Sequence, residues 1–429
     1  METNIGNQIP VNPKKSWLHY GYVVVGAGFL TQVILLISMR SLSIALVSIQ
    51  ETLKISYAQV GLISSYFGLV YAGAAFFWGW LADKTGPRLA LTGAGACASV
   101  GLLLFGLLGG QSLNTAIAAY TIVGLGCAGV FVATVPKLVS AWFVPEKRGH
   151  AMRFITPGGA ITSMILGVVL PLGIASRGWQ SCFVIIGIIA AVVTIGFFSL
   201  LRNDPAEKGL TPVGSPPGTP VVPAPKKDKK DNNFAAVLKM SITWKIGIMY
   251  IIYQLGYMAN STYYVASIKR AGFSGPEAGL AVTIGAIVSI LFMQVWGPLS
   301  DKIERKNVIA IGCFGYAFFA VIYYFVLLGT PNLMVCYLLI SLMLGCFGIT
   351  PVIMAALADY YPAALRGTGS GVISTMSMVG RYGGPFMAGL MIDAAGGKVG
   401  YGFLFAAIAV AVSAILTVTW PKLKVKATS

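Results

Sequence analysis

Two arginines lie where charged side chains are rare, deep within long apolar runs. Arg40 is the single charge within residues 20–49, and Arg381 is the single charge within residues 368–391. A charge at the centre of a membrane helix costs about 3 kcal/mol on insertion scales. A guanidinium can hold a carboxylate or phosphate through two parallel hydrogen bonds, so we interpret both arginines as candidate anion-binding residues. The alternatives are that Arg40 reaches the nearer interface and that Arg381 donates to neighbouring backbone carbonyls.

Residues 242–266 carry a second polar pattern. Seven residues recur there at spacings of three and four, which places them on one face of a helix. They are Tyr250, Tyr253, Gln254, Tyr257, Asn260, Ser261 and Tyr264. The middle of this face lies too deep for an interfacial tyrosine belt, so we predict a cavity wall. The residues expected to orient a small anion with an apolar body are Tyr253, Gln254, Tyr257, Asn260 and, from the first run, Gln32.

Positively and negatively charged residues differ in how deep they lie within the apolar runs. Lys137 is a further candidate for the same site; alternatively, its amine reaches the interface, because it lies close to Trp142 at the end of its run. The 13 acidic residues all fall in loops or at the ends of runs, with Asp359 and Asp393 nearest the membrane. The deep charges are therefore all positive. Buried like charges are unfavourable unless a mobile anion completes them, so this pattern predicts an anionic ligand.

The composition is that of a polytopic membrane protein. Of 429 residues, 56% are hydrophobic and only 10% are charged, against about 25% in soluble domains. Twelve apolar runs near 20 residues predict an all-α fold, because such runs are too long for barrel strands. The predicted spans are residues 20–49, 58–81, 89–109, 115–142, 152–174, 179–201, 242–266, 277–299, 307–328, 333–358, 368–391 and 399–420.

Lysine and arginine are distributed unequally between the connecting segments. If both termini are cytoplasmic, the cytoplasmic segments hold 21 of the 30 Lys and Arg residues, and the external segments hold five. This positive-inside bias predicts a multi-pass protein of the cell (inner) membrane with cytoplasmic N and C termini. It also explains the net charge of +17 without a nucleic-acid partner.

Residues 202–240 divide the chain into two halves. They contain seven prolines followed by the run KKDKKD, and they predict a cytoplasmic linker. The six-helix halves, residues 1–201 and 241–429, repeat each other. GWLADKTGPR from Gly79 corresponds to GPLSDKIERK from Gly297, and EKRG corresponds to ALRG. Both pairs are separated by 218 residues, which indicates a duplicated unit of the kind found in transporters.

At these residues the sequence resembles the major facilitator superfamily along its whole length. GWLADKTGPR matches that family's loop signature, G-x-x-x-D-x-x-G-x-R/K, whereas the second copy has Glu304 where a glycine is usual. The resemblance implies a carrier with a central cavity and charged latches at the cytoplasmic ends of its helices. The implied latch residues are Gly79, Asp83, Gly86, Arg88, Arg148, Gly297, Asp301, Arg305 and Arg366. The alternative is that these charges only fix the topology.

Three partial likenesses within the family point to organic-anion carriers. The stretch from Arg40 to Arg88 looks like anion:cation symporters and organophosphate antiporters, which commonly carry an arginine at this place in the first helix. YYPAALRGTG, together with Arg381, looks like aromatic-acid and sialate symporters, and RNDPAEKGLTP recurs in several carboxylate carriers. The sequence departs from proton-coupled anion:cation symporters, which often carry an acidic residue within the run that corresponds to 115–142, because it has none there. It also lacks the acidic first-helix motif of monocarboxylate porters. ITPGGAITS is also a poor copy of the drug-antiporter motif.

These features predict a secondary transporter of a small organic anion, with a carboxylate as the first expectation. It would work by alternating access, through proton symport or anion exchange. The alternatives are organophosphate or phosphate exchange, efflux of drugs or metabolites, and, in another class, a transporter-like membrane sensor. The six cysteines lack ligand-like spacing, so they predict no metal site. No His, Asp and Glu cluster is expected at membrane depth, so no enzymatic activity or cofactor is expected. The expected partners are the substrate, a co-transported proton or exchanged anion, and membrane lipid around a monomer.

Overall fold

The computed structural model describes residues 19–131, 134–216, 234–362 and 365–421. Within these residues the chain is almost entirely helical and forms no β-strand beyond one isolated bridge, between Phe143 and Val213. The expected all-α fold, with twelve membrane-spanning helices in two six-helix halves, is confirmed.

The N-terminal half builds six spans from seven helices. These are α1 Gly21–Leu53, α2 Tyr57–Thr85, α3 Pro87–Leu108, α4 Leu113–Val130, α5 Val135–Trp142, α6 Pro145–Ile155 and α7 Pro157–Leu200. α7 contains parts of two spans, because Gly178 interrupts the helix with φ +76° and ψ 160°. Glycine reaches such a positive φ without the steric penalty of a side chain, so the chain turns sharply at this point.

The C-terminal half also builds six spans from seven helices. They follow the short helix α8 Phe234–Lys239. They are α9 Ser241–Arg270, α10 Gly275–Lys302, α11 Arg305–Leu328, α12 Leu333–Phe347, α13 Thr350–Tyr360, α14 Arg366–Ala394 and α15 Gly400–Val418.

Two of the spans, α9 and α14, are more polar than the others. Nine helical segments of the described chain are apolar and long enough to cross a membrane, and one of them, Pro145–Leu200, holds two spans. α9 and α14 do not reach that level of hydropathy, and they pack against each other. Polar helices in a membrane protein face the interior rather than lipid, so these two helices are the natural walls of a central site.

The fourth and tenth spans are broken rather than continuous. α4 ends at Val130 before α5 begins at Val135, and α12 ends at Phe347 before α13 begins at Thr350. In each case a proline, Pro136 or Pro351, stands at the second position of the new helix. Proline lacks an amide donor and disfavours helical geometry at the preceding residue, so it starts a helix more readily than it continues one.

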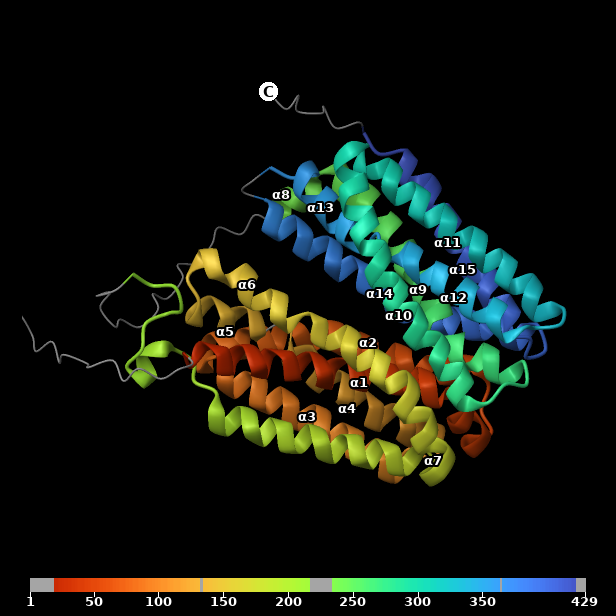
Figure 1. The fold of residues 1–429 in the computed structure, drawn as a ribbon, viewed down its shortest axis with the longest axis horizontal. Helices are drawn as coiled ribbons and strands as arrows, with labels where there is room; N and C mark the ends of the chain where they lie inside the picture. Colours follow the sequence, from red (N-terminus) through yellow and green to blue (C-terminus); the bar gives the residue numbers. More distant parts are fainter. Residues whose placement is uncertain (1–18, 132–133, 217–233, 363–364, 422–429) are drawn as a thin grey trace, which may run out of the picture.

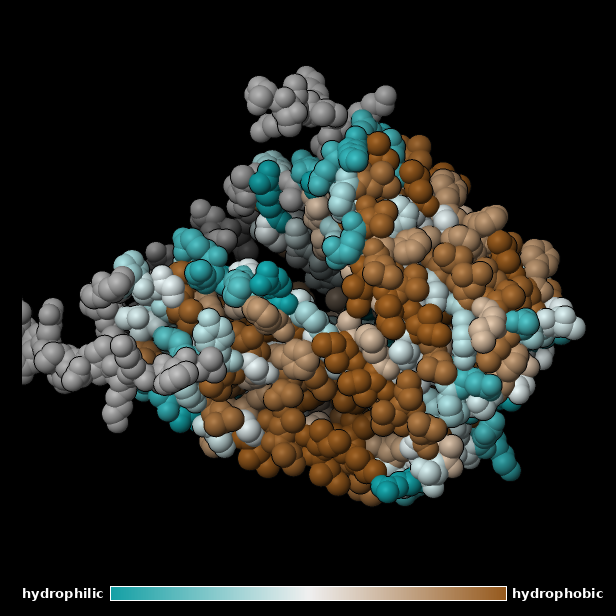
Figure 2. Space-filling model, viewed as in Figure 1, coloured by the Kyte–Doolittle hydropathy of each residue, from teal (hydrophilic) through white to brown (hydrophobic). Residues whose placement is uncertain are grey.

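The two halves form two bundles that separate toward one end. Figure 1 shows them apart where α5, α6, α8 and α13 lie, and this end also carries the described parts of the predicted linker, residues 202–216 and α8. Figure 2 shows the surface hollowed between the halves at this end, with hydrophilic side chains on both rims. The rest of the face in that view is largely hydrophobic, as expected for a surface in contact with lipid.

The halves touch most extensively through two helix pairs, α2 with α14 and α7 with α10, and α1 also contacts α9. Small residues permit the contact: a Cβ atom added at Gly279 on α10 would lie 1.8 Å from the carbonyl oxygen of Gly167 on α7. Thr283 on α10 also donates its hydroxyl to the carbonyl of Met164 at 2.9 Å. Close backbone approach of this kind is a common way for helices to associate in lipid.

The first part of the predicted linker packs against the N-terminal half. The amide of Val213 donates to the carbonyl of Trp142 at 2.8 Å. His19 Nε2 lies 3.1 Å from the carbonyl oxygen of Thr211. The rest of the proline- and lysine-rich stretch, residues 217–233, lies outside the described residues.

Acid is expected to release this packed segment. Burial lowers the pKa of His19 below its usual 6.5, because the imidazolium loses solvation. His19 Nδ1 also accepts the amide of Gly21 at 3.1 Å, and only an unprotonated nitrogen can accept. The unfolded state therefore binds a proton more readily than the folded state. The stability contributed by neutral His19 is present above pH 6.5 and is lost as the pH falls below it.

Hydrogen–deuterium exchange at the amide of Val213 measures this effect. After correction for the intrinsic rate, protection should fall as the pH is lowered from about 7.5 to about 5. A glutamine keeps a neutral donor at the position, so His19→Gln should abolish the pH dependence. Protection that stays constant in the parent protein over this range would contradict the prediction.

Candidate functional site

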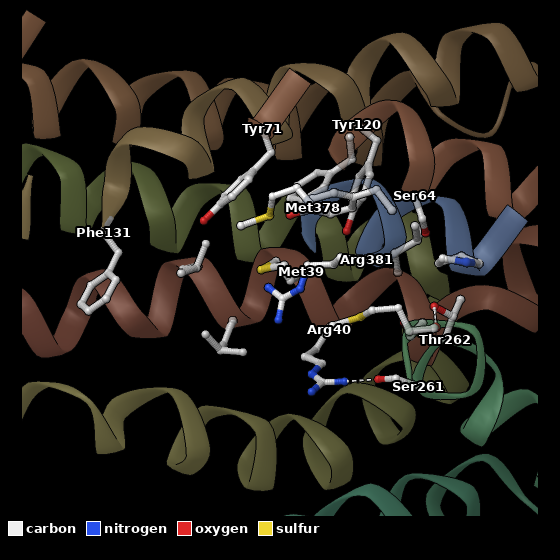
Figure 3. Close-up of a pocket in the computed structure, with 18 of the residues that line it drawn as sticks. Met39, Arg40, Ser64, Tyr71, Tyr120, Phe131, Ser261, Thr262, Met378 and Arg381 are labelled. Carbon is white, nitrogen blue, oxygen red and sulfur yellow. Dashed lines mark hydrogen bonds between the residues drawn. The ribbon is translucent and has the colours of Figure 1, made fainter. Parts of the chain in front are cut away.

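A cavity of about 350 Å³ lies between the two halves. Its walls come from α1, α2 and the end of α4 in the N-terminal half, and from α9 and α14 in the C-terminal half. Figure 3 shows the side chains of Arg40 and Arg381 in this cavity, with Tyr71 and Tyr120 on one side and Ser261 on the other. The structure thus brings together the two arginines that the sequence singled out.

Arg40, on α1, contacts the opposite half. Its Nη1 donates to Oγ of Ser261 at 2.6 Å, and its Nη2 lies 3.5 Å from the hydroxyl oxygen of Tyr257, both on α9. Arg40 forms no ion pair with any described residue. A guanidinium has five N–H donors, so most of the hydrogen-bonding capacity of Arg40 remains for a ligand.

The neighbouring polar side chains of α1 are satisfied within the helix. Ser38 and Ser41 donate their hydroxyls to the carbonyls of Ile34 and Ile37, each at 2.7 Å. Such back-bonding hides a hydroxyl inside an apolar span. Arg40, in contrast, extends its polar atoms to the other half.

Arg381, on α14, has an unmet donor. Its Nε is buried and has no hydrogen-bond partner. Close packing fixes the helix around it, since a Cβ atom at Gly380 would lie 1.8 Å from the carbonyl oxygen of Ile251 on α9. A buried donor without an acceptor costs about 1–3 kcal/mol.

Aromatic rings form the wall beside Arg381. The ring centroid of Phe67 lies 5.2 Å from that of Tyr120, 6.0 Å from that of Tyr71 and 6.1 Å from that of Tyr382. These rings provide an apolar surface with phenol groups at its edge, which suits a compact substrate body. These aromatic residues were not predicted from the sequence. The available signal was the position of Tyr382 directly after Arg381.

The cavity is electrostatically one-sided. No Asp or Glu side chain is among its described lining residues, whereas both arginines are. Two cations facing one weakly polar space repel each other, and an anion between them neutralises both. Over the described residues, no group of three or more His, Cys, Asp or Glu side chains is arranged to hold a metal ion.

A second cavity of about 230 Å³ adjoins the first at Arg40. It is lined by Tyr257 and Tyr264 of α9, with Ser163 of α7 and Ser289 of α10. Arg40 lies in the wall of both cavities.

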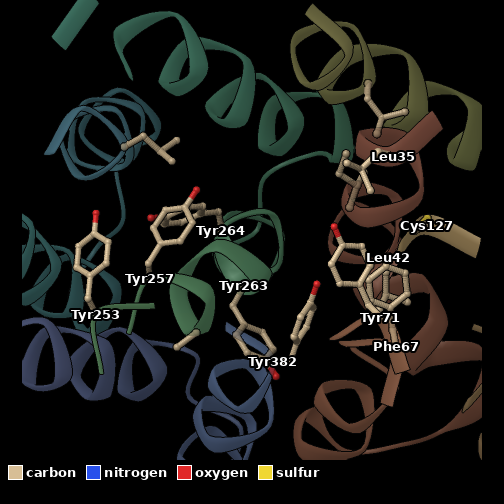
Figure 4. Packing of buried hydrophobic residues seen from close by; sticks show 14 of the residues in the cluster. Leu35, Leu42, Phe67, Tyr71, Cys127, Tyr253, Tyr257, Tyr263, Tyr264 and Tyr382 are labelled. Atoms are coloured by element: carbon tan, nitrogen blue, oxygen red, sulfur yellow. The ribbon is translucent and has the colours of Figure 1, made fainter. Parts of the chain in front are cut away.

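The predicted polar face of α9 divides between several environments. Ser261 lines the main cavity, and Tyr257 and Tyr264 line the second one. The members that line neither are Tyr250, Tyr253, Gln254 and Asn260. Figure 4 shows Tyr253, Tyr257 and Tyr264 inside the C-terminal half, and the rings of Tyr253 and Tyr257 stack on Phe347. A face this wide packs partly into its own bundle, so helical phase alone could not assign the cavity wall.

Two amides of this face remain unsatisfied inside the C-terminal half. The side-chain oxygens of Gln254 and Asn260 are buried without a hydrogen-bond partner, and Asn260 Nδ2 lies 3.9 Å from the sulfur of Met343. Gln32, by contrast, is buried and lines the main cavity on α1, as expected for a substrate-contacting residue.

Lys137 lies apart from the cavity. Its Nζ donates to Oδ1 of Asp83 and to the carbonyl of Gly79, each at 2.7 Å. The structure therefore groups Lys137 with the predicted latch residues and not with the two arginines.

The variant Lys137→Gln is accordingly expected to leave substrate affinity unchanged. The Asp83 carboxylate is 75% exposed, so loss of this ion pair costs less than about 1 kcal/mol of folding stability. The check is an apparent affinity from uptake into proteoliposomes, measured beside Arg381→Gln. A loss of affinity comparable to that of the arginine variant would return Lys137 to the binding site.

The predicted latch residues of the N-terminal half bind within that half. Gly86 turns the chain between α2 and α3 with φ +90°, and Oδ1 of Asn203 accepts the amide of Arg88 at 2.9 Å. The Arg88 side chain donates to the carbonyl of Phe198 at 3.0 and 2.6 Å. Arg148 donates to the last carbonyls of α5, at 3.1 Å for Phe143.

The predicted latch residues of the C-terminal half also bind within their own half. Arg305 lies 4.0 Å from Asp301 and 3.1 Å from Asp359. Arg366 donates to the carbonyl of Tyr361 at 3.3 Å, at the end of α13. A Cβ atom at Gly297 would meet nothing within 4 Å, and the same holds for Gly79 in the other half. The latch role of these residues stays a prediction about a state in which this end is closed.

The fold and the cavity together define a membrane transporter: two six-helix halves enclose a polar site that one end of the molecule exposes. The chain belongs to the Major Facilitator Superfamily, whose family model matches residues 28–266 and again residues 246–429. Each half carries the family pattern, and members of this family transport by alternating access. The resemblance seen in the sequence is thereby confirmed.

Individual relatives are distant but cover most of the chain. A probable sulfoacetate transporter of Cupriavidus necator is 22% identical over 87% of this chain and 88% of its own. The gentisate transporter of Corynebacterium glutamicum is 28% identical over 79% of this chain and 74% of its own. Among solved structures, a D-xylose–proton symporter superposes with a TM-score of 0.73 at 15% identity, covering 94% of this chain and 99% of its own.

Proposed function

We propose that this transporter moves a small organic anion whose carboxylate is bound by Arg40 and Arg381. One observation carries the proposal: the two arginines, one from each half, line a single cavity of about 350 Å³ that has no carboxylate in its described lining. A guanidinium binds a carboxylate through two parallel hydrogen bonds with a fixed geometry. The aromatic wall beside Arg381 then receives the apolar body of the substrate. The sulfoacetate and gentisate relatives support this substrate class.

The transport cycle follows from where the two arginines stand. Arg40 already bonds across the halves to the neutral hydroxyl of Ser261, and an anion between Arg40 and Arg381 would join the halves more strongly, because both of its partners would be charged. Binding therefore favours closure around the substrate, and re-opening on either side releases it. The positive-inside distribution of Lys and Arg supports placing the open, linker-bearing end in the cytoplasm of a cell with this protein in its inner membrane.

A counterflow assay in proteoliposomes tests the substrate class. Purified protein is loaded on one side with an unlabelled compound, and entry of a labelled compound is followed on the other. The compared sets are monocarboxylates and dicarboxylates, sugar phosphates, and neutral or cationic metabolites. Carboxylates are expected to be exchanged and neutral compounds ignored. Exchange restricted to phosphorylated compounds would favour an organophosphate carrier, and exchange of neutral compounds alone would overturn the anion proposal.

The same proteoliposomes show whether transport is coupled to protons or to exchange of a second anion. Proton symport predicts that an imposed pH gradient drives accumulation without an internal substrate. Anion exchange predicts accumulation only when a counter-anion is inside. The described cavity lining has no carboxylate to carry a proton, so in a symport mechanism the proton would travel on the substrate or on a phenol group. A monomer is sufficient for either mechanism, since both arginines come from one chain.

A further inference from the structure

The two halves also meet at the end away from the linker, where α2 begins and α14 ends. Asp393, in the last turn of α14, places its carboxylate on the first turn of α2. Its Oδ1 accepts the amide of Tyr57 at 3.0 Å, and its Oδ2 accepts the amide of Ala58 at 2.8 Å. Each carboxylate oxygen thus takes one N–H across the boundary between the halves, at the positive end of the α2 dipole.

The cap that α2 provides for itself leaves these two amides free. Ser56 Oγ accepts the amide of Gln59 at 3.3 Å, and Gln59 Oε1 accepts the amide of Ser56 at 2.9 Å, which completes a capping box. The first amides of a helix have no partner within the helix, and this box does not reach those of Tyr57 and Ala58. Asp393 supplies the missing acceptors from the other half of the molecule.

Glycines bring the two helices close enough for this contact. A Cβ atom at Gly389, one turn before Asp393, would lie 2.6 Å from the carbonyl oxygen of Tyr57. A Cβ atom at Gly61, one turn after Tyr57, would lie 2.7 Å from Cα of Phe386. The backbones of α2 and α14 therefore touch over this turn, and the short Asp393 side chain reaches the amides directly.

Tyr57 is held by the C-terminal half at two further points. Nε of Arg270 donates to the Tyr57 hydroxyl at 2.9 Å, and the hydroxyl of Tyr263 lies 3.0 Å from the Tyr57 carbonyl oxygen. The start of α2 is thus bound through its amides, one carbonyl and one side chain, all by residues of α9 and α14.

The opposite end of the molecule has no equivalent contact among the described residues. The four ion pairs of the described chain all lie there, and each joins two residues of the same half. Charge-assisted bonds between the halves are therefore concentrated around Asp393 and Arg270, at the closed end, and around Arg40 in the cavity.

We infer that Asp393 is the positioning residue that holds this transporter closed at the start of α2. Both of its hydrogen bonds connect the C-terminal half to α2 of the N-terminal half, so they must break each time the cavity opens at this end. When this end opens, water replaces the carboxylate as the hydrogen-bond acceptor of the two helix amides. The bonds that are lost are charge-assisted, and such bonds are stronger than neutral ones. The inference rests on alternating access and is independent of the nature of the substrate.

The test measures how often this end opens. The six native cysteines are replaced, and a single cysteine is placed in the cavity wall by Ser64→Cys. A membrane-impermeant thiol reagent is added from the α2-start side of oriented vesicles, and the alkylation rate reports the open fraction. Asp393→Asn keeps the shape of the side chain but loses the charge and one acceptor. The rate is expected to rise about 10-fold.

The matched control is Glu277→Gln. Glu277 lies at the same end, but its carboxylate accepts the amide of Ser274 within its own half, at 2.8 Å, so the rate should not change. Tyr263→Phe removes one neutral bond to α2 and should raise the rate by a smaller factor. Equal rates for Asp393→Asn and the parent, or an equal rise for Glu277→Gln, would overturn the inference. Misfolding would raise the alkylation rate from both sides, so a rate from the linker side that does not rise verifies that each variant is folded.

Discussion

Replacing Arg381 with glutamine is expected to lower substrate affinity by about 100-fold or more. Arg381 is the cation that the C-terminal half contributes to the cavity, and its buried Nε has no acceptor in the protein. Removing one partner of a buried charge pair leaves the other charge uncompensated, which is why such changes are costly. Arg381→Lys keeps the charge but loses the planar fork, so we expect an intermediate loss.

Thermal unfolding separates this effect from misfolding. Glutamine relieves the repulsion between two like charges and an unmet donor, so the substrate-free variant should unfold no earlier than the parent. The stabilisation produced by added substrate should disappear. Lys245→Gln is the matched control, because Lys245 is an exposed cation on α9 that does not line the cavity. Undiminished stabilisation of Arg381→Gln by substrate would show that the arginine does not bind it.

The sequence was sufficient for the fold because lipid imposes strict rules on a chain. Each span must satisfy its backbone internally, so long apolar runs predicted helices, and the shared 218-residue offset predicted their duplication. The breaks at Pro136 and Pro351 were missed, since hydropathy is insensitive to one non-helical turn. The packing of Val213 against Trp142 was missed as well, because a proline-rich segment carries no periodic signal.

The site was only partly predictable from the sequence. Arg40 and Arg381 could be found because a charge in an apolar run is costly wherever it points. Tyr71 could not be found, because an aromatic side chain is equally at home in lipid, in a core or in a cavity wall. Tyr253 was expected in the cavity but stacks on Phe347 within its own bundle. Whether such a side chain lies in lipid, in a core or in a cavity wall depends on which helices pack against it, and those helices are distant in sequence.

Contacts between the halves are the feature that is hardest to predict from the sequence. Asp393 was recognised only as an acid close to the membrane, and nothing in its local sequence indicates the start of α2 as its partner. The predicted latch, in contrast, came from a family signature. Its Asp83 bonds within one half in this conformation, so a latch bond to the other half stays a prediction.

Arg40→Gln is the second change with a large expected effect, again about 100-fold in transport. Its Nη1 bonds to Ser261 across the halves, so Arg40 contacts both the substrate space and the moving boundary. Ser261→Ala removes only a neutral acceptor and should change substrate affinity by a few-fold at most. Transport by Arg40→Gln at the parental rate and affinity would exclude Arg40 from the mechanism.

The double variant Arg40→Gln/Arg381→Gln shows how the two arginines share the substrate. If both hold one carboxylate, either single change already breaks that clamp, and the double variant should be little worse than the single ones. If each holds its own acidic group of a dianion, the two losses in binding free energy should add. The comparison needs affinities for a monocarboxylate and a dicarboxylate of similar size. Because Arg40 and Arg381 come from different halves, an additive result for the dicarboxylate would mean that the substrate itself bridges the halves at closure.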